Sequence, residues 1–433
     1  MIMQAAASAP LHATAIPARS FLGEGLVLVF CLFALGVLEP KLSVVNFRNM
    51  TLQQAVDGGS ANLANELKWL ALASLATLAA SRHLERLWTL VLAAWPLMLV
   101  LAYCLLSAVW SDYPTISIRR CFGLIIPTYC LCAALAAIDR PERIANIVYA
   151  AFWAALVCNL LALPLASAFD EAGFFRGVTG NKNTLGGMGA LAILSGVAFS
   201  RRMQGLRLRI LWLLYLIGWS CLLVLSVSKT SIALALGVPM LFYTLVFLSM
   251  CLGTGVAPAA TLLVFVLLAV TGACYAIFDT TLPDLVHLVW YDATFTGRAQ
   301  LWNFMLDAID RNWITGVGFG SFWGVGSKSP NLYAALDYIR LTNQAHNGYL
   351  DVLAALGVFG ILLVIGMMAH ALRKTEALRF TQPCLFRFIW FIAIFSIIHN
   401  TMESSLLVPF SIVWHVTLLT YLVAIWASQE EAS

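Results

Sequence analysis

Long apolar stretches separated by short polar segments are the most regular feature of this chain. A run of about 18 or more apolar residues can cross the hydrocarbon core of a bilayer as an α-helix. Twelve stretches come near or above this length, and the second and eleventh are the shortest. They cover residues 21–39, 67–81, 89–109, 120–138, 145–168, 184–200, 210–226, 231–250, 257–277, 348–371, 385–399 and 408–426. The pattern predicts an all-α integral membrane protein with about 12 transmembrane helices.

The composition supports a membrane protein and excludes several other classes. Hydrophobic residues make up 61% of the chain and charged residues only 11%, whereas soluble domains carry about 25% charged residues. The ten cysteines lie almost entirely inside apolar runs, without a C-x-x-C motif or a Cys/His cluster, so we expect small core hydrophobes and no metal site. The net charge of +4 is too small to indicate a nucleic-acid partner.

The distribution of arginine and lysine predicts the orientation, because cytoplasmic segments of membrane proteins are enriched in both. The short connections SRRMQGLRLR and LRKTEALRF face the same side as the N-terminus if all twelve stretches span, and we expect that side to be cytoplasmic. With this orientation the inner segments hold Arg19, Arg82, Arg86, Arg140, Arg143, Arg201, Arg202, Arg207, Arg209, Arg373, Lys374, Arg379 and Arg387.

The largest segment outside the predicted spans is residues 279–347, between the ninth and tenth spans, and it would face outward. It is rich in aromatic residues and glycine, which favours an ordered and functional lid. Within it, TGRAQLWNFMLDAIDRN has helical periodicity, since Leu301, Phe304 (or Met305), Ala308 and Ile309 share one face. The chain is thus predicted to divide into nine spans (1–278), a large, partly helical periplasmic loop (279–347) and three spans (348–433).

Two asparagines and a histidine stand directly before the tenth span, in NQAHNGYLDVLAALG. A helix that begins near Gly348 and runs inward places His346 and Asn347 at the outer membrane surface. The free N–H groups and partial positive charge of a helix N-terminus suit an anion, and a histidine can accept a proton near neutral pH. The alternative is an interfacial cap, in which Asn347 satisfies backbone N–H groups and His346 stacks on a neighbour.

Three other polar turns are predicted at the same depth. FFRGVTGNKNTLGGMGA brings Arg176 and Lys182, with Asn183 or Thr184 placed to cap the sixth span, while SVSKTS contains Lys229. FTGRAQLW places Arg298 in the first turn of the loop helix, where a cation opposes the helix dipole and needs another partner. Each basic residue alone could be snorkelling to lipid headgroups. Their coincidence on one face predicts a pocket for a diphosphate.

Two further stretches add candidates on the outer side. IIHNTMESSLL contains Glu403, which could pair with a basic residue, contact sugar hydroxyls or be a solvated loop acid. VWSDYPTISIRRCFG brings Arg119 and Arg120 to the outer end of the fourth span, and we expect one of the two to face the interior of the bundle.

With these residues identified, the chain resembles the O-antigen ligase/polymerase superfamily of bacterial envelope enzymes. The motifs GNKNTLG, SVSKTS, GR…LW…GVGFGSFW and AHNGYLDVLAALGVFG stand in the order that this family shows. The resemblance covers most of the chain and is strongest from about residue 110 to 365. WSDYPTISIRR and NTMES make it look closest to the branch that polymerises exopolysaccharide.

The resemblance implies a metal-independent glycosyltransferase without a cofactor. Its donor would be a glycan on undecaprenyl diphosphate, used at the periplasmic face of the bacterial inner (cytoplasmic) membrane. Carried over to this chain, the catalytic residues would be His346 and Arg298. The residues expected to bind the substrate or diphosphate would be Arg176, Lys182, Asn183, Lys229, Asn347, Arg119, Arg120 and Glu403.

The expected function is polymerisation of lipid-linked oligosaccharide repeats into exopolysaccharide. Transfer of the glycan to lipid A core by an O-antigen ligase is the alternative, although ligases often show arginine where this chain has Lys229. A multi-span transporter is the alternative from another class, but the polar residues collect at one surface rather than near mid-membrane. The expected partners are the lipid-linked glycan and the bilayer, and a chain-length regulator or other polysaccharide-export proteins are candidates.

Overall fold

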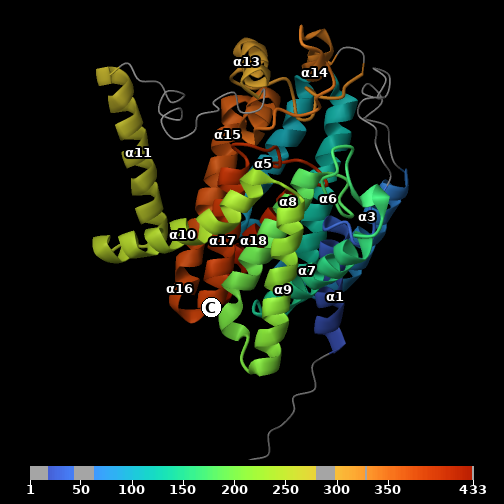
Figure 1. The fold of residues 1–433 in the computed structure, drawn as a ribbon, viewed down its shortest axis with the longest axis vertical. Helices are drawn as coiled ribbons and strands as arrows, with labels where there is room; N and C mark the ends of the chain where they lie inside the picture. The colour runs from blue at the N-terminus through green and yellow to red at the C-terminus, as the bar shows by residue number, and fades with distance from the viewer. Residues whose placement is uncertain (1–17, 43–62, 279–297, 327–328, 432–433) are drawn as a thin grey trace, which may run out of the picture.

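The fold is almost entirely helical, as the computed structural model of the chain shows for residues 18–42, 63–278, 298–326 and 329–431 (Figure 1). Within these ranges the β-structure amounts to an isolated antiparallel bridge between Phe169 and Phe175. In lipid, a helix satisfies every backbone hydrogen bond within its own segment, which explains why apolar runs of this length fold in this way. The predicted all-α fold class is confirmed.

Each predicted span coincides with a helix, except that the third coincides with the pair α4 and α5. The membrane-type helices are α1 (Ala18–Ala34), α3 (Leu63–Ala80), α4 (Leu84–Ala93), α5 (Trp95–Leu106), α6 (Pro114–Ala136), α7 (Arg143–Ala162), α8 (Lys182–Ala198), α9 (Leu206–Leu225), α10 (Lys229–Leu252), α11 (Val256–Phe278), α15 (Gly348–Lys374), α17 (Pro383–His399) and α18 (Ile412–Glu430). Shorter helices are α13 (Arg298–Ile309), α14 (Asp337–Arg340) and α16 (Leu378–Thr381).

By length and apolar composition, seven of the described helices can cross a membrane, or eight if α4 and α5, bent by 77°, form one broken span. Helices α1 and α17 contribute shorter apolar stretches. The chain is therefore a multi-pass membrane protein, whereas the predicted number of 12 spans is not established by these criteria.

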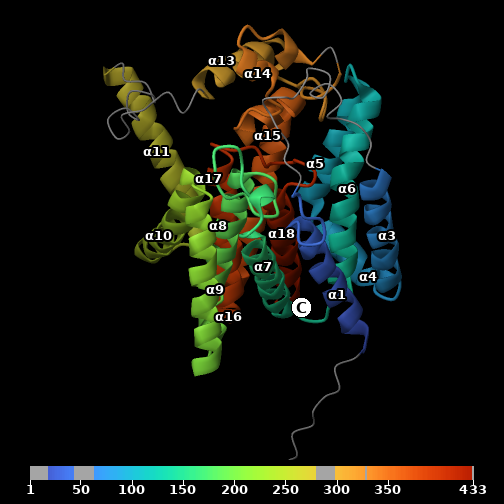
Figure 2. The same ribbon diagram turned by 45° about the vertical axis from the view of Figure 1, so that its right-hand side comes forward.

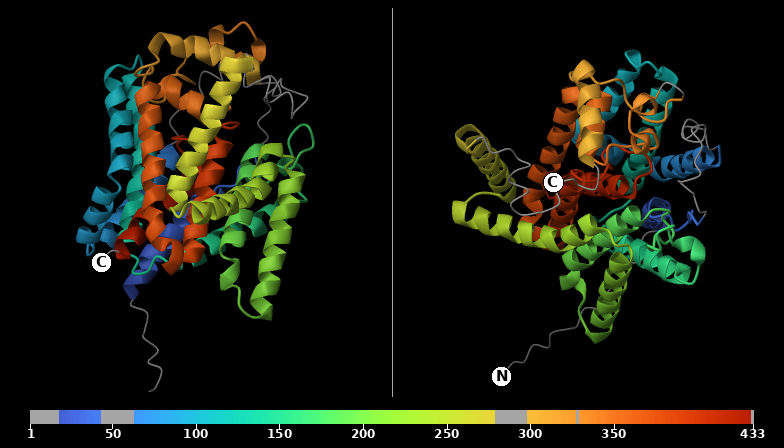
Figure 3. Two further views of the ribbon diagram at one scale, coloured as in Figure 1. Left: turned by 90° about the vertical axis from the view of Figure 1, so that its left-hand side faces the viewer. Right: turned by 45° about the horizontal axis from the view of Figure 1, so that its top comes forward.

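Burial within the bundle distinguishes central from peripheral helices. In α18, 94% of the most apolar stretch is buried by other helices, while the corresponding shares in α9 and α11 are 22% and 17%. Helices α10 and α11 project from the side of the bundle (Figures 1 and 3). The exposed leucines and valines of α9 and α11 suit contact with lipid tails, because a helix that is apolar all round avoids water.

Helices α13 and α14 lie over the end of the bundle at which α15 begins (Figure 2). The helix predicted in TGRAQLWNFMLDAIDRN is confirmed as α13, and its buried residues Leu301, Met305 and Ile309 form the predicted face. Met305 and Ile309 share a small core with Ala354 of α15. The start of the predicted loop, residues 279–297, lies outside the described residues, and the division of the chain into three parts stays an expectation.

Helix α15 is broken at Gly357, where the backbone adopts φ 63° and ψ −166°. The segment that follows α13 lies against this break. There Val358 N–H donates to Trp313 O at 2.9 Å, and Gly318 N–H donates to Ala355 O at 2.9 Å. Non-helical backbone at membrane depth is tolerated when protein groups satisfy it in this way. The break therefore anchors the Gly-rich loop, residues 316–326, to α15, the helix that begins two residues after His346.

Replacing Gly357 with alanine is expected to destabilise the fold strongly. The conformation is essentially restricted to glycine and costs other residues about 1–3 kcal/mol, and a Cβ would lie 2.1 Å from Ile314 O. Thermal unfolding of the purified protein in detergent should show a clearly lower midpoint. Gly366→Ala in the same helix is the control, because a Cβ there meets nothing within 4 Å. Equal midpoints for the two variants would contradict this assignment.

Candidate active site

Asn347 is the N-cap of α15, and its side-chain oxygen accepts hydrogen bonds from Tyr349 N–H at 3.1 Å and Leu350 N–H at 3.2 Å. The capping role considered for Asn347 is confirmed, and its predicted contact with a diphosphate stays a prediction. His346 precedes the cap with a positive φ of 49°, a conformation that is uncommon for a residue with a side chain. Its side chain bonds to a carboxylate instead of stacking on a neighbour.

Glu403 is the point at which distant predicted site residues meet. Its Oε1 accepts hydrogen bonds from Arg298 Nη2 at 2.8 Å and Asn183 Nδ2 at 3.0 Å, while its Oε2 lies 3.2 Å from His346 Nδ1. The three partners come from α13, α8 and the segment before α15. Of the alternatives for Glu403, pairing with a basic residue is the one observed. These four residues are called the Glu403 cluster below.

The cluster is shielded from water but not sealed. The exposed fractions of the side chains are 12% for Glu403, 18% for Arg298 and 31% for His346. Burial alone would raise the pKa of the Glu403 carboxyl, but the hydrogen bond to His346 and the positive charge of Arg298 outweigh it, so this pKa lies below its ordinary value. Glu403 is therefore a carboxylate at neutral pH, and its contacts weaken only as the pH falls through that lowered pKa.

The ionised state of Glu403 fixes how His346 is oriented. A carboxylate can only accept hydrogen bonds, so Nδ1 of His346 donates in this contact. In the neutral imidazole, Nε2 then carries the free lone pair and can accept a proton from another group. Gln344 Nε2 lies 3.5 Å from the same Nδ1, but an amide nitrogen can only donate, so it forms no hydrogen bond with an Nδ1 that donates to Glu403. The pair of Glu403 and His346 has the geometry of an oriented general base.

The other basic residues predicted for the site occupy different positions. Arg176 is buried, and its guanidinium donates to the backbone oxygens of Gly180 at 3.0 Å and Ser167 at 2.8 Å. Lys182 lies over the ring of Phe174 with its Nζ 3.7 Å from the ring centroid. Their predicted contacts with a diphosphate stay predictions.

Lys182 is nevertheless adjacent in sequence to Asn183, which belongs to the Glu403 cluster. Both residues lie in the first turn of α8, and the cap of that helix is Asn181, whose side chain accepts from Asn183 N–H at 2.7 Å. The prediction that Asn183 or Thr184 caps the helix is wrong, since the side chain of Asn183 turns to Glu403 instead. Lys229, the first residue of α10, is exposed, and its predicted role stays a prediction.

The two arginines of α6 differ in environment. Arg120 is half-buried and donates to three backbone oxygens of the Gly-rich loop, those of Gly320, Trp323 (2.7 Å) and Gly324 (3.0 Å). Arg119 is exposed and lines a large cavity next to α6. Arg120 is therefore the one of the two that turns into the protein, and the bonds of its guanidinium position the loop.

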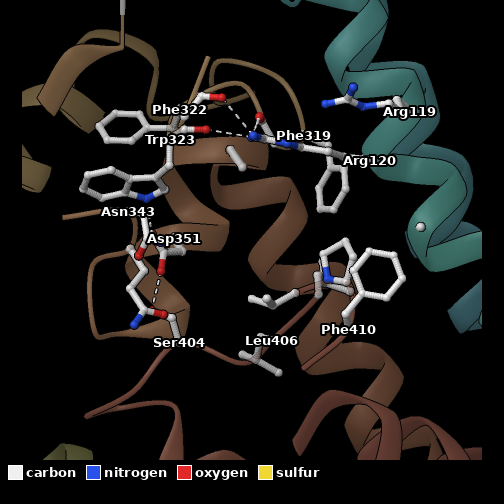
Figure 4. Close-up of a pocket in the computed structure, with 18 of the residues that line it drawn as sticks. Arg119, Arg120, Phe319, Phe322, Trp323, Asn343, Asp351, Ser404, Leu406 and Phe410 are labelled. Carbon is white, nitrogen blue, oxygen red and sulfur yellow. Dashed lines mark hydrogen bonds between the residues drawn. The ribbon is translucent and has the colours of Figure 1, made fainter. Parts of the chain in front are cut away.

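A cavity of about 1060 Å³ lies next to the first turns of α15, and Figure 4 shows residues that line it. Trp323, Asn343, Asp351 and Ser404 line one side of it, and Phe410 lies on another (Figure 4). Further lining residues come from α3, α6, the Gly-rich loop, the start of α15 and the segment before α18. The wall combines aromatic rings with amide, hydroxyl and carboxylate groups, which is a suitable lining for a sugar or another amphipathic ligand.

The cavity and the Glu403 cluster are neighbours rather than one space. His346, Arg298 and Glu403 do not line the cavity, but Gln344 and Ser404 do. Ser404 follows Glu403 directly, and Gln344 stands two residues before His346. The cluster is therefore connected to the lining of the cavity through residues that are close in sequence.

Sequence reasoning missed a half-buried carboxylate, Asp351, in the first turn of α15. Its Oδ1 accepts from Trp323 Nε1 at 2.7 Å, and it also bonds to Ser404 Oγ. The available signal was one acidic residue in an otherwise apolar run, five residues after His346. Acidic residues inside membrane helices are costly and mark functional positions, and that rule could have identified Asp351.

Comparison with known proteins gives two similarities. Residues 213–365 match the family described as O-Antigen ligase, a region that contains Lys229, Arg298 and His346. The Exopolysaccharide production protein ExoQ of Rhizobium meliloti (strain 1021) is 25% identical over 281 residues, which are 62% of this chain. The aligned region covers 62% of that relative, so this chain spans less than two thirds of the relative's length. Together with the motifs and the helical membrane fold, these similarities support the assignment of the chain to the O-antigen ligase/polymerase superfamily.

Proposed function

We propose that this protein polymerises undecaprenyl-diphosphate-linked oligosaccharide repeats into exopolysaccharide at the periplasmic face of the bacterial inner membrane. The observation that carries the proposal is the convergence of Arg298, Asn183 and His346 on Glu403. A histidine oriented by a carboxylate beside an arginine is suited to an acceptor hydroxyl and an anionic leaving group. The similarity to a protein named for exopolysaccharide production supports this choice of product.

Arg298 is the residue proposed to hold the diphosphate of the donor. Its guanidinium is paired with Glu403, with 2.8 Å between Nη2 and Oε1. A guanidinium presents five N–H donors, so it can bind phosphate oxygens with the groups that Glu403 leaves free. Lys182, one residue from Asn183 in the first turn of α8, adds a second positive charge.

The proposed reaction is a single displacement at the anomeric carbon. A hydroxyl of the acceptor sugar forms the new C–O bond, the bond between the anomeric carbon and the diphosphate oxygen breaks, and the hydroxyl proton passes to Nε2 of His346. Negative charge grows on the departing oxygen, where Arg298 stabilises it. Direct displacement inverts the anomeric configuration. Glu403 stabilises the imidazolium that forms, as a carboxylate does in a catalytic triad.

The cavity is proposed to bind the glycan. Trp323 and Phe322 from the Gly-rich loop offer ring faces for the apolar faces of sugars, and Asn343 and Gln344 offer amides for hydroxyl groups. Because His346 does not line the cavity while Gln344 and Ser404 do, the reactive end of a glycan seated there is proposed to reach the histidine past these two residues. This arrangement also explains the need for an ordered loop over α15.

Ligation of a finished glycan to lipid A core is the second candidate, and the match of residues 213–365 to the O-Antigen ligase family supports it. The donor and the chemistry at the anomeric carbon would be the same in both reactions. Only the acceptor differs, which is another lipid-linked repeat in polymerisation and lipid A core in ligation.

The test is an assay in which the purified full-length protein receives a single lipid-linked repeat without lipid A core. The expected result is a ladder of longer lipid-linked products, seen by gel electrophoresis or mass spectrometry. Product that forms only after lipid A core is added would replace polymerase with ligase. A protein that forms neither product, although it is folded and given the glycan of its own host, would contradict glycosyl transfer.

A further inference from the structure

The half-buried carboxylate of Asp351 is hydrogen-bonded to the residue before His346 and, through Ser404, to the residue after it. On one side, Ala345 N–H donates to Oδ1 at 3.1 Å and to Oδ2 at 3.2 Å. On the other side, Asn347 N–H donates to Ser404 Oγ at 3.1 Å, and the same hydroxyl donates to Oδ2 of Asp351. One carboxylate therefore fixes the residue before the histidine directly and the residue after it through a serine.

His346 needs such restraint because its backbone is strained. Its φ of 49° lies in the left-handed region, which costs a residue with a side chain about 1–3 kcal/mol and persists only when surrounding contacts impose it. Two more contacts hold the same turn. Trp302 Nε1 donates to Ala345 O at 3.0 Å, and Gly348 N–H donates to Asn400 O at 2.8 Å. Asp351 is the charged member of this set and the one that acts on both flanks.

We propose that Asp351, acting with Ser404, is a positioning residue that holds His346 in its reactive orientation. The inference rests on the proposed function, because it assigns the clamp to the step in which His346 accepts a proton. Asp351 touches neither His346 nor Glu403 through the bonds described, so its effect passes through the backbone of residues 345–347 and through Ser404. A shift of the imidazole by about 1 Å is enough to cost a large factor in rate.

The same carboxylate links the clamp to the wall of the cavity. Trp323 Nε1 donates to Asp351 at 2.7 Å, and the backbone oxygen of Trp323 accepts from Arg120 of α6 at 2.7 Å. Arg120, Trp323, Asp351 and Ser404 all line the cavity. The hydrogen-bonded chain from Arg120 to Asp351 thus holds the Gly-rich loop and the turn of His346 in a fixed relation. The clamp also supports the wall against which a glycan would lie.

The experiment compares Asp351→Asn, Ser404→Ala and Ser404→Thr in the purified full-length protein with a single lipid-linked repeat as substrate. Asparagine keeps the size of the side chain but replaces one accepting oxygen with an NH₂ group. The expected result for Asp351→Asn and Ser404→Ala is a fall in kcat of about tenfold or more, with KM within about twofold of the wild type. Ser404→Thr retains the hydroxyl and should restore kcat.

Hydrogen exchange of the peptide that covers residues 345–350 is the second measurement. It should become faster in Asp351→Asn and Ser404→Ala and stay at the wild-type rate in Ser404→Thr. Glu376→Gln is the matched control, since Glu376 also accepts a backbone N–H, that of Ala257 at 2.7 Å, and it lies just past the end of α15 opposite to Asp351. That variant should leave kcat and the exchange of residues 345–350 unchanged.

Three outcomes would overturn the proposal. They are an unchanged kcat in folded Asp351→Asn, a change confined to KM, which would make Asp351 a substrate contact, and lost activity without faster exchange at residues 345–350. Failure of the proposed function looks different, because the wild type itself would then form no product. The exchange measurement still reports on the clamp in that case.

Discussion

Replacing His346 with alanine is expected to lower the rate of glycosyl transfer by about 10²–10⁴, the range typical for loss of a general base. The imidazole is the basic nitrogen group of the Glu403 cluster. Because its Nδ1 donates to Glu403 at 3.2 Å, the lone pair of Nε2 can accept a proton. Alanine removes the proton acceptor and leaves Arg298 paired with Glu403. The measurement is the initial rate of product formation from a lipid-linked repeat, with the variant in the membrane at the wild-type level.

His83→Ala is the control for this substitution. His83 precedes α4, and its side chain makes no capping hydrogen bond there. The His83→Ala variant should form polymer at the wild-type rate. This result would separate loss of the base from a general effect of losing a histidine. Polymer of normal amount and length from His346→Ala would remove this residue from the mechanism, and the assignment of the active site would fail with it.

The second large effect is expected for Arg298→Ala. A group that stabilises developing negative charge in a shielded site contributes about 2.7–4 kcal/mol, so kcat/KM should fall by about 10²–10³. Arg298→Lys should recover only part of the activity, because lysine keeps the charge but lacks the planar fork of donors. Initial rates over a range of substrate concentrations measure both variants.

Arg311 provides the matched control for Arg298. It is an exposed arginine just after α13, the helix that Arg298 begins. Arg311→Ala should leave kcat/KM unchanged. If instead the alanine variants at both positions lost activity equally, the effect would come from the net charge of the loop, and the specific role of Arg298 would be wrong.

The local elements of this fold were predictable because their causes are local in sequence. The apolar runs gave the helices, and the step from Asn347 to Gly348 correctly located the start of α15. The break at Gly357 was not predictable in the same way. It depends on Trp313 and Ile314, which follow α13, meeting a glycine in the middle of an apolar run.

The site was predictable as a list of residue types but not as an arrangement. His346, Arg298 and Glu403 were candidates because they lie in the polar turns predicted on the outer side and in motifs of the family that the chain resembles. Their meeting joins Glu403 to residues 57, 105 and 220 positions away, and no periodicity carries that information. Arg176 was a candidate because of its charge and the family resemblance, and its guanidinium donates to backbone oxygens of its own loop.

The role proposed for Asp351 depends on the backbone groups that it holds, which its residue type does not reveal. A pattern of side-chain types contains no signal that Ala345 and Asn347 will direct their N–H groups toward one carboxylate and its serine. The positive φ of His346 is equally invisible in the sequence. Both features follow from how the loop lies against α15 once the helices have packed.

We propose that Arg298 of the Glu403 cluster binds the lipid diphosphate and that His346 accepts the proton in the chemical step. This division of roles is the basis of the proposed function. It is tested most directly by the affinity of the purified protein for undecaprenyl diphosphate, measured for the wild type, His346→Ala and Arg298→Ala. The wild type and His346→Ala should bind with equal affinity, and Arg298→Ala should bind at least about tenfold more weakly, a difference of about 1.4 kcal/mol or more. Wild-type affinity in Arg298→Ala would contradict the role of Arg298 in binding the diphosphate.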